Sequence, residues 1–421
     1  MRLLIVILLF ICFDVKTQVI TQRGREHLTI LAANEMCGRG YVNGGYQKAS
    51  EYVVKQFATF GLKPIGKSYA QNFSYPVNTF PDSVSVTIGN TRLKTGHDFI
   101  VDEASGSDVG TFIPHYFSIN DFFLKFEPVF QENEIVVVDP IPAKMDKDSI
   151  AIIRTRIEKF NSDVPLIQLV NGKLTWSVAT EAQKHARIEI KADKFDKNAG
   201  EITLNIHNVL NPSFQSANII GVKKARKKRC KEYLVITAHL DHLGMMGSTA
   251  IFNGANDNAS GISMLLCLAE YYAKLKPNMN IAFIAFGGEE AGLIGSKYFV
   301  EHPLIPLEKI KFLLNIDLMG TGEDGITVVN ATKFASEFDI LKKINAENNY
   351  LKLVKPRGEA ANSDHYWFTM KGVHSFFIYT MGGTAAYHDV NDRPEQLPLT
   401  EFEDLYKMII SFFDQVAIIK K

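Results

Sequence analysis

The sequence predicts an α/β protein, with a mostly parallel central sheet flanked by helices and a β-rich insert. Two observations support this prediction. From about residue 206 onward, short and continuously apolar runs alternate with amphipathic helical segments, a pattern typical of strands that are covered on both faces. Between about residues 76 and 205, short apolar runs and turn signals indicate strands instead.

Length and composition predict how the chain is organised. A chain of 421 residues is long for one hydrophobic core, so we expect two units or one core that carries an insert. Lysine plus arginine and aspartate plus glutamate both number 46, and this balance gives no reason to expect a nucleic-acid partner. The predicted parts are a signal peptide over 1–17, an N-terminal helical part of the core over 18–75, the insert over 76–205 and the main part of the core over 206–421.

The N-terminal segment has the pattern of a secretory signal. Met1-Arg2 precedes an unbroken apolar run from Leu3 to Phe13, which is too short to span a bilayer comfortably. We therefore expect a secreted, periplasmic or extracellular protein without stable membrane insertion after cleavage. Cys12 would then be lost, and three cysteines would remain. A bridge between Cys37 and Cys230 has no support in the sequence, whereas Cys267 fits a buried thiol.

The N-terminal part and the insert contain one clear helix and several strands. Apolar residues at helical spacing predict a helix over 47–60, with Gly61 as its C-terminal cap. Asn171-Gly172, between the runs 166–170 and 173–176, predicts a β-hairpin. The other strands expected in the insert are 84–88, 135–138 and 150–153.

The C-terminal half alternates strands with helices. The expected strands are 233–238, 281–286, 312–316, 326–329 and 376–379, and the expected helices are 261–276, 293–300 and 400–419. In open α/β sheets, ligands gather beyond the carboxyl ends of the strands. Polar side chains stand at these positions: His239 and Asp241 after the first strand, Glu289 and Glu290 after the second, Asp317 after the third, Asp257 before the helix 261–276, and His388 after the strand 376–379.

These residue types suit a pair of divalent metal ions. Two histidines and three carboxylates can hold two zinc ions that share a bridging carboxylate and a bridging water. Asp241 is suited to accept the second N–H of the His239 ring, which would fix the tautomer. Glu289 and Glu290 are adjacent, so one can bind metal while the other takes a proton from the water. Each residue alone is more often structural, but five in order at strand ends indicate a metal centre.

Several motifs resemble the co-catalytic two-zinc aminopeptidases, a family that includes bacterial leucyl aminopeptidases and is related to glutamate carboxypeptidases and glutaminyl cyclases. The resemblance covers the N-terminal helical stretch and residues from about 215 to the end, and the insert stands where many relatives carry a protease-associated domain. The motifs are Ala238-His-Leu-Asp-His-Leu-Gly244, Gly254-Ala-Asn-Asp-Asn-Ala-Ser-Gly261, Phe286-Gly-Gly-Glu-Glu-Ala-Gly-Leu-Ile-Gly-Ser296, Asn315-Ile-Asp-Leu-Met-Gly320, Ser363-Asp-His365 and Tyr387-His-Asp389.

The resemblance implies a role for each residue that matches a motif. His239 and Asp317 would hold one zinc ion, Glu290 and His388 the other, and Asp257 would bridge them. Glu289 would be the general base, and the Asp257–Asn258 peptide bond would be cis.

The resemblance also suggests residues around the substrate. Some relatives carry a tyrosine three residues before Ser-Asp-His, where this chain has Ala360, so Tyr379, Tyr387 and a zinc ion all remain candidates for stabilising the oxyanion. We expect Tyr379, Tyr387 and His365 to line the substrate site, with His242 behind the ligands.

The main functional hypothesis is a zinc aminopeptidase that acts on peptides. Three alternatives stay open. A carboxypeptidase would need a basic residue for the substrate carboxylate, for which Arg357 is a candidate. A glutaminyl cyclase would hold one zinc ion. A non-enzymatic binding protein would hold none.

Overall fold

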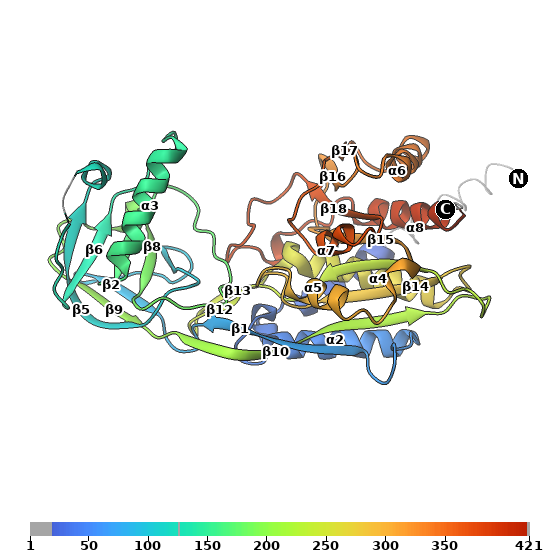
Figure 1. Cartoon of the computed structure of the whole chain (residues 1–421), viewed down its shortest axis with the longest axis horizontal. Coiled ribbons are helices and arrows are strands. Elements are labelled where there is room, and N and C mark those ends of the chain that lie inside the picture. The colour runs from blue at the N-terminus through green and yellow to red at the C-terminus, as the bar shows by residue number, and fades with distance from the viewer. Residues whose placement is uncertain (1–18, 125–126, 419–421) are drawn as a thin grey trace, which may run out of the picture.

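The computed structural model describes residues 19–124 and 127–418; the predicted signal peptide and Cys12 lie outside them. The described residues form two bodies, each built around its own eight-stranded sheet (Figure 1). Two long antiparallel strands, β1 (Ala70–Thr79) and β10 (Val209–Lys223), lie side by side and extend between the larger body and the smaller one. The insert is therefore joined to the core by a paired ribbon and not by a free linker.

The central sheet belongs to the larger body and positions the polar residues picked out from the sequence. Its four central strands are mutually parallel, so their carboxyl ends meet at one edge. The antiparallel β1 and β10 lie on one side of them, and β16 pairs antiparallel on the other. These pairings confirm the mostly parallel sheet. The remaining strands, in spatial order after β1 and β10, are β14 (Asn280–Phe286), β11 (Tyr233–His239), β15 (Ile310–Asp317), β18 (Ser375–Met381), β16 (Gly325–Val329) and β17 (Val354–Pro356).

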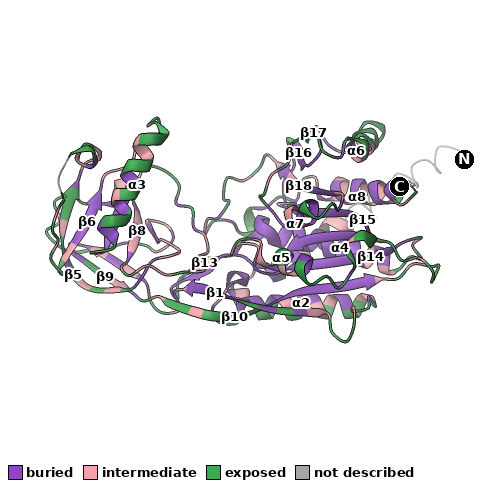
Figure 2. Ribbon diagram, viewed as in Figure 1, coloured by how far each residue is buried: buried purple, intermediate pink, exposed green. Residues whose placement is uncertain are grey.

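Helices cover both faces of this sheet because successive strand residues point to opposite sides. On β11, Leu234, Ile236 and Ala238 belong to one apolar cluster, whereas Val235 belongs to another. Figure 2 shows the central strands of the larger body, such as β14 and β15, as almost continuously buried. The helices on the first face are α2 (Gly45–Phe60), α4 (Gly261–Ala273), α6 (Ala335–Asn348) and α8 (Phe402–Ile418), and those on the second face are α5 (Ile294–Glu301) and α7 (His365–Met370). Gly61 ends α2 in a left-handed conformation, as predicted.

The insert is a second mixed sheet that also carries a helix. Its strands are, in spatial order, β3 (Thr91–Arg92), β2 (Ser85–Ile88), β9 (Ile202–Ile206), β5 (Asp108–Phe117), β6 (Glu134–Val138), β7 (Leu166–Val170), β8 (Arg187–Lys191) and β4 (Phe99–Val101).

One strand predicted for the insert was wrong. Residues 150–153 lie in helix α3 (Lys147–Asn161), whose side chains Ile153, Ile157 and Phe160 pack on β5 and β6. Their spacing is helical, and the Asp146 side chain caps the helix by accepting a hydrogen bond from the Ser149 N–H at 2.9 Å. The four residues 150–153 alone are too few to distinguish a helix from a strand, whereas the helical spacing is clear over the whole of 147–161.

The predicted hairpin at Asn171-Gly172 was also wrong. The strand β7 continues into a long irregular segment, residues 171–186, and the next strand β8 is its parallel neighbour, with Leu166 opposite Arg187. Residues 173–176 form no strand, although Leu174 and Trp176 are buried. This segment is called the 171–186 loop below.

The three described cysteines, Cys37, Cys230 and Cys267, are free thiols, so the structure contains no Cys37–Cys230 bridge. Cys267 is buried in α4, as predicted. Across the described residues, every helix is too short or too polar to cross a lipid bilayer.

Candidate metal centre

The predicted ligands lie together at the carboxyl edge of the central sheet. His239 and Asp317 are the last residues of the neighbouring strands β11 and β15. Glu289 and Glu290 follow β14 after a tight turn, in which a Cβ at Gly287 would clash with the Tyr46 hydroxyl. The other two predicted ligands come from connecting segments, Asp257 between β13 (Ala250–Phe252) and α4, and His388 after β18.

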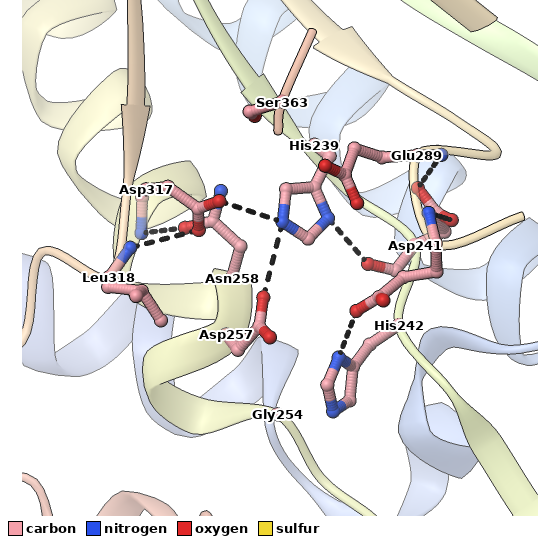
Figure 3. A network of polar contacts seen from close by, with 12 residues as sticks. His239, Asp241, His242, Gly254, Asp257, Asn258, Glu289, Asp317, Leu318 and Ser363 are labelled. Atoms are coloured by element: carbon pink, nitrogen blue, oxygen red, sulfur yellow. Dashed lines mark hydrogen bonds and ion pairs between the residues drawn. The ribbon is translucent and has the colours of Figure 1, made fainter. Parts of the chain in front are cut away.

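Asp257 is the centre of the arrangement. Its Oδ1 lies 3.2 Å from His239 Nε2, and its Oδ2 lies 3.2 Å from His388 Nε2. Asp317 Oδ2 lies 3.4 Å from the same His239 nitrogen, so His239, Asp257 and Asp317 form a first group of candidate ligands. Glu290 Oε2 lies 3.2 Å from His388 Nε2, so His388, Asp257 and Glu290 form a second group. Figure 3 shows Asp257 and Asp317 both directed at the same nitrogen of the His239 ring. Each carboxylate oxygen of Asp257 thus belongs to a different group.

These separations fit zinc. Zinc binds histidine nitrogen and carboxylate oxygen at about 2.0–2.2 Å, so two ligands at a tetrahedral angle are about 3.4 Å apart. The four nitrogen–oxygen distances lie between 3.2 and 3.4 Å. Ligand atoms of His239, Asp257 and Glu290 also all lie within 4.8 Å of one another, so the two groups are close enough to share one bridging carboxylate.

The hydrogen bonds of the two histidines direct Nε2 toward these carboxylates. His239 Nδ1 lies 3.1 Å from the backbone carbonyl of Asp241, and His388 Nδ1 lies 2.8 Å from that of Trp176. A carbonyl oxygen only accepts, so Nδ1 carries the proton in both rings. In a neutral ring, Nε2 then presents a lone pair to carboxylate oxygens, and this contact is favourable only with a cation between them.

The pKa shifts of the site's histidines and carboxylates also favour a bound cation. Burial alone would lower the pKa of both histidines, but the neighbouring carboxylates raise the pKa of His388 to about 11 and that of His239 well above its ordinary value. Burial raises the pKa of Glu289 well above its usual range, and the nearby Glu290, Asp364 and Asp317 add to the effect. The site therefore holds an excess of negative charge that divalent cations would neutralise.

Asp241 does not play the part predicted for it. The backbone carbonyl of Asp241, and not its side chain, accepts the hydrogen bond from His239. The carboxylate instead accepts hydrogen bonds from the backbone N–H of Glu289 at 3.1 Å and of Glu290 at 3.2 Å, and from the Tyr41 hydroxyl at 3.2 Å. Asp241 therefore positions the two glutamates, and its side chain makes no hydrogen bond to the His239 ring.

Two charged residues that the sequence reading missed hold the Asp257 segment in place. The fully buried Arg39 donates hydrogen bonds to five backbone carbonyls, those of Leu31, Leu240, Asn253, Gly254 and Asp257. The buried carboxylate of Asp392 accepts from the N–H groups of Asn256 and Asp257. Both act on backbone atoms, for which the sequence offers no side-chain pattern. The peptide bond between Asp257 and Asn258 is cis, as the resemblance implied.

The remaining predicted site residues differ in how they lie. His242 is buried behind the ligands, and its Nδ1 donates to Glu290 Oε1 at 2.8 Å. Tyr387 is half-exposed and stacks on the His388 ring, with centroids 4.0 Å apart.

Tyr379 lies opposite Asp317 in the sheet, and its hydroxyl accepts a hydrogen bond from Arg357 at 3.1 Å. His365 is only 1% exposed and stacks on Phe377, so the structure corrects the expectation that it contacts substrate directly.

Comparisons with known proteins point to one family. Residues 218–413 match the sequence profile of peptidase family M28. Aminopeptidase YwaD of Bacillus subtilis (strain 168) is 37% identical over 122 residues, which cover 29% of this chain and 25% of that protein. The chain thus spans about a quarter or less of the length of the curated relatives it matches.

Solved structures share the fold of nearly the whole chain. A zinc aminopeptidase from Bacillus subtilis, BSAP, superposes with a TM-score of 0.70 at 17% identity and covers 95% of each chain. An aminopeptidase from Aneurinibacillus sp. strain AM-1 superposes with a TM-score of 0.64 at 19% identity, covering 94% of this chain and 93% of that one. At such identities the likeness establishes the fold alone.

Proposed function

Residues 218–413 belong to peptidase family M28, and from that membership and the geometry of the site we propose that the chain is an exported aminopeptidase that uses two zinc ions. The observation that carries the proposal is the placement of Asp257, whose two oxygens face two different histidines at 3.2 Å. His239 and Asp317 would hold one ion, and Glu290 and His388 the other. Export is proposed from the apolar N-terminal run, and the aminopeptidase activity from the names of the relatives.

Several residues of the chain would have separate roles in the reaction. Two zinc ions held there would polarise the scissile carbonyl and acidify a water molecule. Glu289 takes a proton from the attacking water and passes it to the leaving amine, a role that its place beside the predicted ligand Glu290 supports. Asp241 holds the backbone of both glutamates, and His242 fixes the free oxygen of Glu290. The half-exposed Tyr387, stacked on His388, is in a position to contact a bound peptide.

A set of matched peptides tests this proposal. We expect release of the N-terminal residue from Leu-Ala-Phe and from its C-terminal amide, but not from N-acetyl-Leu-Ala-Phe. A zinc chelator should abolish the release, and added zinc should restore it. Cleavage of the acetylated peptide but not of the amide would identify a carboxypeptidase instead. Ammonia release from an N-terminal glutamine peptide would identify a cyclase, and no reaction with any peptide would favour a binding protein.

A further inference from the structure

The 171–186 loop makes an unusual connection. It joins two adjacent parallel strands of the insert, β7 and β8. Such strands need a crossover of about a dozen or more residues, usually a helix that packs on the sheet. Here the crossover contains no helix and instead reaches the ribbon that joins the two bodies, where the N–H of Asn78 in β1 donates to the carbonyl of Ala179 at 2.8 Å. Long irregular connections inside compact domains are uncommon, and those that occur are often functional.

The loop contacts the segment that carries His388. The Trp176 carbonyl accepts from His388 Nδ1 at 2.8 Å, and the Trp176 N–H donates back to the His388 carbonyl at 3.2 Å. The Lys173 ammonium donates to the carbonyl of Ala385 at 2.7 Å and to the carbonyl of Tyr387. Two residues of the insert therefore hold three residues of the segment that carries the predicted ligand, namely Ala385, Tyr387 and His388.

His388 needs this support because of its backbone. Its φ is +55°, in the left-handed region that residues with a Cβ rarely adopt. The predicted ligand also depends on the insert for its tautomer, since the carbonyl of Trp176 is the group that places the proton on Nδ1. In the other predicted site, the same function is served by the carbonyl of Asp241, which belongs to the core.

The contact is continuous with the core of the insert. The side chain of Val390, two residues beyond His388, is buried in the same apolar cluster as Leu174 and Trp176. A Cβ at Gly96 would lie 2.8 Å from Val390, so the insert approaches this segment too closely for any larger residue there. The Trp176 ring also packs against Phe252, in the strand β13 that precedes Asp257, with centroids 4.6 Å apart.

We propose that the 171–186 loop is a working part of the metal centre, with Lys173 as a positioning residue that sets the affinity of the Glu290–His388 site for zinc. The inference rests on the proposed function and adds to it a role for the insert. The two zinc sites should then differ in their dependence on the insert. The His239–Asp317 site is built entirely from the core, whereas the Glu290–His388 site is completed by Lys173 and Trp176.

Zinc binding to three lysine variants tests the inference without relying on activity. The variant Lys173→Met removes the ammonium and keeps the stem, and Lys173→Arg keeps a donor. Lys184→Met changes an exposed lysine of the same loop whose ammonium makes no hydrogen bond to the segment 385–388. Competition with a chromophoric zinc chelator measures both affinities. We expect Lys173→Met to weaken one of the two sites by about tenfold or more. Lys173→Arg should restore most of that affinity, and Lys184→Met should match the wild type.

Kinetics give a second readout. At limiting zinc, kcat of Lys173→Met should fall and be recovered by excess zinc, with little change in KM. If Lys173→Met binds both zinc ions with the affinities of the wild type, the inference is overturned while the proposed function stays intact. An equal loss at both sites would also overturn it, because it would indicate general destabilisation. A wild-type protein that binds no zinc would overturn the proposed function itself. If Lys173→Met does not fold, Lys173→Gln replaces it, with weakening of one site again expected.

Discussion

Replacing Asp257 by asparagine should leave the protein folded but unable to hold two zinc ions, with peptidase activity at the level of the zinc-free enzyme. The two oxygens of Asp257 face two histidines, and an amide offers only one oxygen ligand, because its NH₂ group is a donor. Whichever way the amide turns, one group loses its shared ligand. Metal analysis after dialysis should find at most one zinc ion per chain.

A matched substitution shows whether the loss is specific to the site. Asp163→Asn changes an exposed aspartate of the insert and should retain two zinc ions and full activity. Two tightly held ions in Asp257→Asn would remove Asp257 as the bridge. The far-UV circular dichroism spectrum of both variants should match that of the wild type, since the backbone carbonyl and N–H of Asp257 still bond to Arg39 and Asp392.

Replacing Glu289 by glutamine should separate catalysis from metal binding. Glu289 follows β14 next to a predicted ligand, yet its own carboxylate has no hydrogen-bond partner among the residues described, which suits a group that handles a proton. A glutamine keeps the shape and cannot act as a base. We expect kcat to fall by about 10²–10⁴-fold, with two zinc ions retained and little change in KM.

Neighbouring glutamates provide the contrast for this experiment. Glu290→Gln should lose zinc from the Glu290–His388 site, because it alters a predicted ligand. Glu301→Gln, at the exposed end of α5, should behave as the wild type. Near-normal turnover in Glu289→Gln would exclude this residue as the base. Loss of zinc in that variant would instead make it a ligand.

The sequence predicted well where side chains follow a regular pattern. The strands at the centre of the larger body and the helices 47–60 and 261–276 appear within a few residues of their expected bounds, because long apolar stretches at a fixed period leave little ambiguity. The strand ends then determine which polar residues share an edge of the sheet. This is why the sequence alone predicts that His239, Asp317 and Glu290 lie together.

The failures have a common physical cause. The isoleucines at 150–153 and the run 173–176 are short, and a short apolar run fits a strand, a helix or a buried loop equally well. The side chain of Asp241 is a good acceptor and the sequence predicts that it bonds to the His239 ring, but the backbone carbonyl of Asp241 holds that position. The side chains of Arg39, Asp392 and Lys173 bond to backbone atoms of other residues, and Trp176 acts through its own backbone carbonyl; every residue type carries such backbone atoms. Such contacts follow from the assembled fold and leave no local mark in the sequence.

The most direct test of two zinc ions bridged by Asp257 is an anomalous difference map collected at the zinc absorption edge from crystals of the purified protein. The geometry predicts two peaks in the carboxyl edge of the central sheet, one among His239, Asp317 and Asp257, and the other among His388, Glu290 and Asp257. A single peak, or peaks that are not separated by the Asp257 carboxylate, would contradict the account.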